Sequence, residues 1–367
     1  MFFTHPSSLM TSSPVYIGDV PVGDGYPTVF MAEIGTFFNK DIDLALKLVK
    51  AAVDAGAPVV KSEVLHNPDV CIKDSGLLVK YNHAFGSKTE NYRAAIERKI
   101  VPLERYRELY GYCKSLGVPF VASVYDVEGI DFFVEIGGAA IKIASHQIGN
   151  IPLIRYAAAT GLAILIDTGR AYFHEVARMV YEAQQAGSGG VIVLHHPGAN
   201  PAPPEAHHMR VMQTYKEALN VPVGLTCHYR GDEILYLAVG MGANILEKGV
   251  VDDPDREEMD LVSAASLSET PAIIRKVQNC WQAIGAAPMR PKEPRDLSDR
   301  KALVARRPIA AGEAIGYDNV LFAWPPSGIP AESWDVVVGK PVTRSLAANE
   351  VIRWSDVQLD EPARTIR

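Results

Sequence analysis

The chain is poor in cysteine, has no excess of positive charge and contains no long apolar run. Its four cysteines lie far apart, and no two of them form a CxxC pair, so neither a structural zinc site nor a disulfide-rich miniprotein is expected. No apolar run reaches the ~18 residues of a membrane span. The net charge of −7 argues against a nucleic-acid-binding protein, which normally carries a basic face. We therefore expect neither a membrane nor a nucleic acid as a partner.

The N-terminal segment has neither the basic region nor the apolar region of a signal peptide. Together with the dispersed cysteines, this predicts a cytoplasmic protein. The composition itself is globular, because 48 % of the 367 residues are apolar and 22 % are charged, enough to bury a sizeable core. At about 100–200 residues per domain, this length suggests two domains.

Eight short apolar runs alternate with amphipathic helical patterns in the first part of the chain. Because the runs are continuously apolar, they are typical of parallel strands covered on both faces. They lie at residues 29–34, 58–63, 118–124, 139–145, 163–168, 191–196, 221–227 and 243–249. Eight such units over ~250 residues predict a (β/α)8 TIM barrel. A doubly wound sheet is the alternative, but no GxGxxG or Walker motif supports it.

Composition changes near residue 284 and predicts the domain organisation. Residues 1–284 are expected to form the barrel with an N-terminal extension, and the Pro- and charge-rich stretch 285–299 a linker. Residues 300–367 contain short strand-like runs with frequent Gly, Pro and Asn turns, which predict a small, mainly β domain. The unit 64–117 is longer than the others, and its polar, glycine-punctuated stretch 66–92 would form a long loop on the active face of the barrel, which makes it a candidate lid.

Polar residues follow every predicted strand, and barrel enzymes place their chemistry at these strand ends. Lysines and an arginine there suit an anionic substrate, whereas Glu33 and Glu63 are candidate general acid/base groups. The candidate cations are Lys61, Lys142, Lys248 and Arg170. Histidines at these ends could hold a divalent metal, although adjacent His195 and His196 point to opposite faces of a strand, so at most one faces a pocket.

Each candidate has a purely structural alternative. Lys61 and Lys248 could pair with neighbouring glutamates as a structural ring, since buried charges need partners. Asp126 lies directly before a helical pattern and is predicted to cap that helix rather than to react. The residues alone thus predict a two-domain barrel protein whose mouth suits a small anionic ligand.

Several motifs together resemble the N-acetylneuraminate (sialic acid) synthase family, which includes pseudaminic and legionaminic acid synthases and spore coat polysaccharide protein E. The motifs are MAEIG (31–35), APVVKSE (57–63), KIAS (142–145), IDTG (166–169), VLHH (193–196), NPAPP (200–204), VGLTCH (223–228) and LEKG (246–249). The C-terminal segment resembles the family's antifreeze-like (SAF) domain. The resemblance covers residues 15–360 and implies a homodimer in which the SAF domain of one subunit caps the barrel of the other.

The resemblance also implies a reaction. Family members condense phosphoenolpyruvate (PEP) with an aldose, release phosphate and form a 2-keto-3-deoxy sugar acid, with Mn²⁺ or Mg²⁺ as the metal. By position, Glu33, Lys61 and Lys142 are expected to be catalytic, and His228, with His195, to bind the metal. Substrate contacts are expected from Ser123, Ser145, Thr168, Arg170, Lys248 and Asp260.

The chain departs from the family pattern at positions that bind metal and substrate. Gly249 stands where the family has its second metal histidine, Asp167 where it has a phosphate-contacting serine, and Gln147 where it has a glutamate. Phe37 falls in a polar family motif, and Trp324 takes the place of the SAF-domain arginine. Two alternatives therefore stay open: a different barrel reaction on a keto acid, for example through a lysine Schiff base, and a non-catalytic sugar-acid-binding protein.

Overall fold

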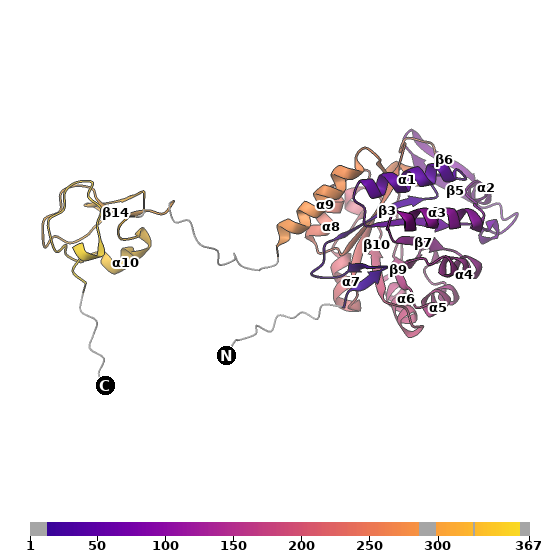
Figure 1. Ribbon diagram of the computed structural model, residues 1–367, viewed down its shortest axis with the longest axis horizontal. Helices are drawn as coiled ribbons and strands as arrows, with labels where there is room; N and C mark the ends of the chain where they lie inside the picture. Colours follow the sequence, from indigo (N-terminus) through magenta and orange to yellow (C-terminus); the bar gives the residue numbers. More distant parts are fainter. Residues whose placement is uncertain (1–12, 286–298, 326, 360–367) are drawn as a thin grey trace. The chain divides into compact units, whose positions relative to one another are not determined.

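The computed structural model describes residues 13–285, 299–325 and 327–359. The chain divides into two compact units, Met1–Ala286 and Ala287–Arg367 (Figure 1). Most of the linker predicted at 285–299 falls at 286–298, outside the described residues.

Eight parallel strands form a closed barrel in the first unit. In barrel order they are β3 (Val29–Gly35), β4 (Val59–Val64), β7 (Phe120–Val124), β8 (Ala140–Ile143), β9 (Ala163–Asp167), β10 (Val191–His195), β11 (Val223–Cys227) and β12 (Ile245–Val251). The barrel closes because β12 pairs in parallel with both β11 and β3. The predicted (β/α)8 barrel is confirmed, and each predicted strand lies on an observed one.

Helices follow the strands and surround the barrel (Figure 1). They are α1 (Ile42–Asp54), α3 (Leu103–Ser115), α4 (Val127–Glu135), α5 (Ile151–Ala159), α6 (Phe173–Gln185), α7 (Val211–Leu219), α8 (Glu233–Gly240) and α9 (Thr270–Ile284). Two of the helix starts have aspartate caps: Asp41 accepts from the Leu44 amide at 3.1 Å and Asp126 from the Gly129 amide at 2.7 Å. The predicted capping role of Asp126 is therefore confirmed.

The amino end of the barrel is filled with apolar side chains. A short antiparallel hairpin, β1 (Val15–Ile17) and β2 (Val20–Val22), packs there against inward-facing strand residues such as Met31, Val59 and Leu165. A second, larger apolar cluster lies between the strands and the surrounding helices. These apolar contacts close the amino end, and the polar residues of the barrel interior lie at the carboxyl end.

The segment between β4 and α3 is long and carries its own structure. It contains the helical turn η1 (Pro68–Val70), the antiparallel hairpin of β5 (Leu78–His83) and β6 (Gly86–Asn91), and the short helix α2 (Tyr92–Glu97). Residues on both sides of this hairpin line the central cavity described below, among them Cys71, Tyr92 and Lys99.

The second unit has a small core of its own. Strands β14 (Ala302–Ala305) and β15 (Val320–Ala323) pair antiparallel, and isolated bridges join other extended segments, with the short helix α10 (Trp334–Val337) alongside. Its apolar core includes Leu303, Ile329 and Ile352. In the described part of the chain, none of the helices combines the length and the apolar character needed to cross a bilayer.

Candidate active site

A cavity of about 370 Å³ opens at the carboxyl end of the barrel. All eight barrel strands, or the residues just after them, contribute to its wall. The titratable residues that line it are Glu33, Lys61, Glu63, Cys71, Tyr92, Lys99, Tyr125, Lys142, His146, Asp167, His196, His228, Glu247 and Asp260. This density of ionisable groups exceeds what packing alone requires and marks the cavity as the candidate active site.

Strand alternation explains which residues face this cavity. On β12, Ile245 and Glu247 point inward, whereas Leu246 and Lys248 point toward the helices, because successive side chains leave a strand on opposite faces. The same alternation brings Lys61 of β4 and Lys142 of β8 into the cavity.

Lys61 lies among three carboxylates. It donates a hydrogen bond to Oε1 of Glu33, and its Nζ lies 3.4 Å from Oε1 of Glu247 and 3.7 Å from Oε1 of Glu63. Burial alone would lower the pKa of Lys61, but attraction by Glu33, Glu247 and Glu63 raises it above its ordinary value. Lys61 is therefore a buried ammonium group.

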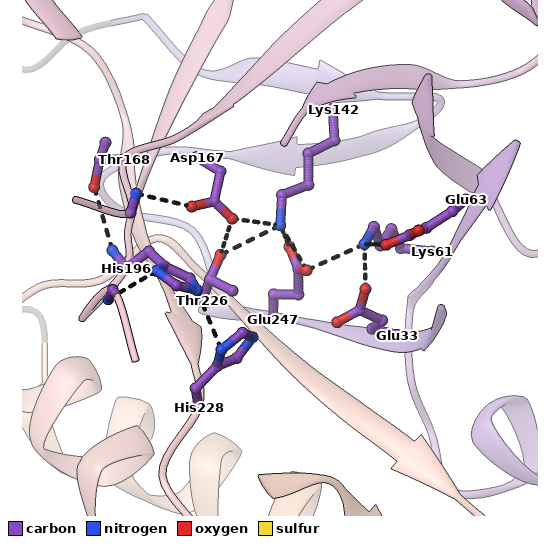
Figure 2. A network of polar contacts seen from close by, with 12 residues as sticks. Glu33, Lys61, Glu63, Lys142, Asp167, Thr168, His196, Thr226, His228 and Glu247 are labelled. Atoms are coloured by element: carbon purple, nitrogen blue, oxygen red, sulfur yellow. Dashed lines mark hydrogen bonds and ion pairs between the residues drawn. The ribbon is translucent and has the colours of Figure 1, made fainter. Parts of the chain in front are cut away.

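Lys142 shares Glu247 with Lys61 (Figure 2). Its Nζ donates to both carboxylate oxygens of Glu247, at 2.6 and 2.7 Å, and lies 2.8 Å from Oδ2 of Asp167. Burial would lower the pKa of Lys142, but Asp167 and Glu247 raise it overall. Two lysines are thus surrounded by four carboxylates, those of Glu33, Glu63, Asp167 and Glu247.

Two of these carboxylates, Glu33 and Asp167, differ in how strongly they hold a proton. Burial raises the pKa of Glu33 to about 7, although Lys61 acts in the opposite direction. Burial also acts to raise the pKa of Asp167, but attraction by Lys142 outweighs it and holds that pKa below its ordinary value. Two buried carboxyl groups with opposite shifts are the usual signature of an acid/base group beside a permanently charged one.

Hydroxyl groups complete the wall beside the lysines. Thr226 donates to Oδ2 of Asp167 at 3.2 Å and accepts from Lys142 at 3.4 Å. Oγ of Ser123 is buried without a hydrogen-bond partner among the described residues. Because a buried hydroxyl without a partner costs free energy, this donor is available to a ligand. Ser145 also lines the cavity.

Asp260 lies at the rim, directly before the helical turn η4 (Leu261–Ser263). Its Oδ1 accepts a hydrogen bond from Nδ2 of Asn200 at 2.9 Å. This places Asp260 in one cavity with the catalytic candidates.

Two histidines from neighbouring strands contact each other at the cavity wall. Nε2 of His196, which follows β10, lies 3.2 Å from Nδ1 of His228, which follows β11 (Figure 2). The amide of Gly198 donates to Nδ1 of His196 at 2.9 Å, and the amide of His196 donates to Oγ1 of Thr168 at 3.2 Å. Thr168 therefore positions the His196 backbone and is not among the residues that line the cavity.

Three other predicted site residues point away from the cavity. Lys248 lies on the helix side of β12, where Nζ donates to the carbonyls of Tyr229 at 2.5 Å and Gly231 at 3.1 Å. His195 faces outward, with Nε2 2.5 Å from the carbonyl oxygen of His207. Arg170 uses Nε to bind the Gly198 carbonyl at 2.7 Å. In this structure none of the three contacts the cavity that they were expected to serve.

Several residues of the cavity were absent from the expected site, among them Glu247, His196, Tyr125 and Lys99. Glu247 in β12 and His196 just after β10 lie at alternate positions that face the barrel interior, as Lys61 does. Strand alternation could therefore have selected them over Lys248 and His195. Tyr125 donates to Oε2 of Glu63 at 2.8 Å. Lys99 lies in the long segment before α3, where no periodic pattern indicates the direction of a side chain.

Neighbouring side chains occupy the space around Gly249, the position at which the resemblance expects the family's second metal histidine. A Cβ atom on Gly249 would lie 3.1 Å from Cβ of Ala264 and 3.2 Å from Cε2 of Phe37. A histidine there would clash with both unless they moved. In residues 13–285, 299–325 and 327–359, no group of three or more His, Cys, Asp or Glu side chains is arranged to hold a metal ion. The residues present therefore do not fit the divalent metal that the resemblance implied.

Curated relatives match nearly the whole chain. An uncharacterized protein of Methanocaldococcus jannaschii is 27 % identical over 94 % of this chain and 98 % of its own length. An N,N'-diacetyllegionaminic acid synthase of Campylobacter jejuni is 27 % identical over 89 % of this chain and 99 % of its own. An N-acetylneuraminate-9-phosphate synthase of Mus musculus is 24 % identical over 92 % and 94 % of the two chains.

Solved structures share the fold. A sialic acid synthetase of Leptospira borgpetersenii superposes with a TM-score of 0.69 at 24 % identity, covering 79 % of this chain and 95 % of the other. A putative spore coat polysaccharide biosynthesis protein E of Chromobacterium violaceum gives 0.69 at 22 %, covering 90 % and 99 %. Residues 300–358 match the SAF domain model and residues 48–288 match the NeuB family model. The chain therefore belongs to the NeuB family, whose named relatives here are enzymes of the sialic acid synthase type.

Proposed function

We propose that the protein condenses phosphoenolpyruvate with an aldose, an amino sugar or a close relative, to give a 2-keto-3-deoxy sugar acid and phosphate. The observation that carries this proposal is the buried arrangement of Glu33, Lys61 and Lys142 in one cavity. These residues occupy the positions at which the family resemblance expects the catalytic glutamate and the two PEP-binding lysines.

The proposed reaction balances as follows. C3 of phosphoenolpyruvate attacks the aldehyde carbon and forms the new C–C bond, and the aldehyde oxygen takes up a proton to become a hydroxyl. Water adds to C2, and cleavage of the C2–O bond expels phosphate and leaves the 2-keto acid. Lys61 and Lys142 would bind the anionic groups of phosphoenolpyruvate. Glu33, with a pKa of about 7, would exchange the proton.

The two lysines suit anion binding better than covalent catalysis. Schiff-base formation needs a neutral amine, which desolvation supplies when no acid lies nearby. Carboxylates instead raise the pKa of both Lys61 and Lys142. The pKa of Lys248 is lowered by burial, but this lysine lies outside the cavity. The cavity therefore favours condensation over a lysine-dependent lyase.

The test is phosphate release from phosphoenolpyruvate by the purified protein over a panel of aldoses with and without N-acetyl groups. Aldose-dependent release that is lost in Lys142→Met and kept in the exposed-lysine control Lys47→Met would support the proposal. Calorimetry tests the first step separately: a wild-type protein that binds no phosphoenolpyruvate would refute the proposal.

The proposal extends to assembly. The family resemblance implies a homodimer in which each SAF domain caps the partner's barrel, and this capping would complete the sugar-binding side near Asp260. Sedimentation of the full chain, and of a chain ending at residue 285, measures whether the SAF domain carries the dimer contact. A monomeric full-length chain would refute this part of the proposal.

A further inference from the structure

The histidine pair has a fixed arrangement of protons. An amide N–H can only donate, so the bond from Gly198 makes Nδ1 of His196 the unprotonated nitrogen of that ring. The proton of His196 is then on Nε2, which lies 3.2 Å from Nδ1 of His228 and donates to it. Nδ1 of His228 is therefore an acceptor, and the His228 proton is on Nε2.

This arrangement leaves neither ring with a free lone pair for a metal ion. Both acceptor nitrogens, Nδ1 of His196 and Nδ1 of His228, already accept hydrogen bonds. Coordination uses a nitrogen lone pair, so a metal at His228 would require this hydrogen-bond chain to break. What His228 offers instead is an N–H donor.

The packing around Gly249 also argues against a metal ion beside His228. Phe37, Ala264, Val251 and Leu261 form a small apolar cluster beside Gly249. An apolar cluster of this kind supplies no ligand for a cation, and it fills the volume in which a second ligand would lie. Two independent features, the proton arrangement and the packing, thus oppose a metal at the same place.

We infer that this site uses no divalent cation and that the Nε2–H group of His228, fixed by His196, takes its place as the group that binds the aldose carbonyl oxygen. A neutral N–H donor stabilises a developing alkoxide by a hydrogen bond, as in an oxyanion hole. His196 is then a positioning residue, because it acts through His228. The role toward the aldose rests on the proposed function, whereas the metal and proton assignments do not.

The first experiment measures Mn²⁺ binding without any substrate. The electron paramagnetic resonance signal of free Mn²⁺ is expected to keep its full intensity when equimolar protein, previously treated with EDTA, is added. A loss of signal in the wild type that disappears in His228→Ala would overturn the inference. A loss of signal that persists in His228→Ala would indicate a metal elsewhere and leave the inference standing.

The second experiment reads the proton positions directly. In ¹⁵N-histidine-labelled protein, the ¹⁵N shifts of both His196 and His228 are expected to show the neutral Nε2–H tautomer. His196→Ala should release His228 to a mixture of tautomers, whereas His196→Gln, whose side-chain amide can place an N–H donor near the position of the His196 Nε2–H, should retain the wild-type state. The exposed His174→Ala serves as the control. A His228 proton on Nδ1 in the wild type would overturn the inference.

The two experiments separate this inference from the proposed function. If no aldose supports phosphate release, the proposed reaction fails while the metal and tautomer results stand unchanged. If release occurs and EDTA abolishes it, the reaction stands and the metal-free assignment fails. Release that is insensitive to EDTA and falls at least tenfold in His196→Ala, with the activity partly restored in His196→Gln, supports both.

Discussion

Replacing Glu33 with glutamine should change how the stability of the barrel depends on pH. In the folded protein burial raises the pKa of Glu33 to about 7, from an ordinary value of 4.5. At about 1.36 kcal/mol per pKa unit, this difference corresponds to about 3 kcal/mol. It is the free-energy penalty of ionising Glu33 in the folded state relative to the unfolded chain.

The direction follows from proton binding. Between pH 4.5 and about 7 the folded protein binds Glu33's proton more tightly than the unfolded chain does, so the folded state loses stability as the pH rises through this interval. Above about pH 7 the loss is complete. Glu33→Gln cannot ionise, so its stability relative to the wild type should increase by about 2–3 kcal/mol between about pH 5 and about pH 8.

Urea unfolding monitored by far-UV circular dichroism measures this difference, because most of the helices belong to the barrel. The control is Glu128→Gln, which removes an exposed carboxylate from α4. Lys61 retains Glu63 and Glu247 as partners in the variant, so folding is expected to survive. A stability difference between wild type and Glu33→Gln that stays constant with pH would refute a raised pKa and remove the basis for Glu33 as the proton-exchanging group.

Three further predictions concern the same cavity and the helix α4 beside it. Asp167→Ser should tighten phosphoenolpyruvate binding at least tenfold in calorimetry, because it removes a buried negative charge beside Lys142; unchanged affinity would contradict phosphate binding there. Phosphoenolpyruvate binding near pH 8 should be accompanied by the uptake of a proton, because an added anion raises the pKa of Glu33 further. Calorimetry in buffers of different ionisation enthalpy measures this uptake, and a binding enthalpy that is the same in all buffers would exclude it. Asp126→Ala should lower the unfolding free energy by about 1–2 kcal/mol, because α4 loses its N-cap and His66 loses its 3.0 Å partner; an unchanged urea midpoint would disprove the capping role.

The sequence alone determined the barrel and much of its inner surface. Continuous apolar runs separated by amphipathic helices predict parallel strands because both faces of such strands are buried. Strand alternation then assigns Lys61, Lys142 and Asp167 to the inside, and the cap of α4 follows from Asp126 at its start. These features are local, since they depend on the direction of each side chain along its own strand or helix.

The tertiary structure decided which of these groups meet. Glu247 joins Lys61 to Lys142 although these residues belong to three different strands, and only the closed barrel brings them within ion-pair distance. The pairing of His196 with His228, rather than a role for His195, likewise depends on adjacent strands. Ion pairs and proton positions depend on distances of a few ångströms between groups far apart in sequence. No local periodicity encodes such distances, so the charge distribution of the cavity could be assigned only from the folded chain.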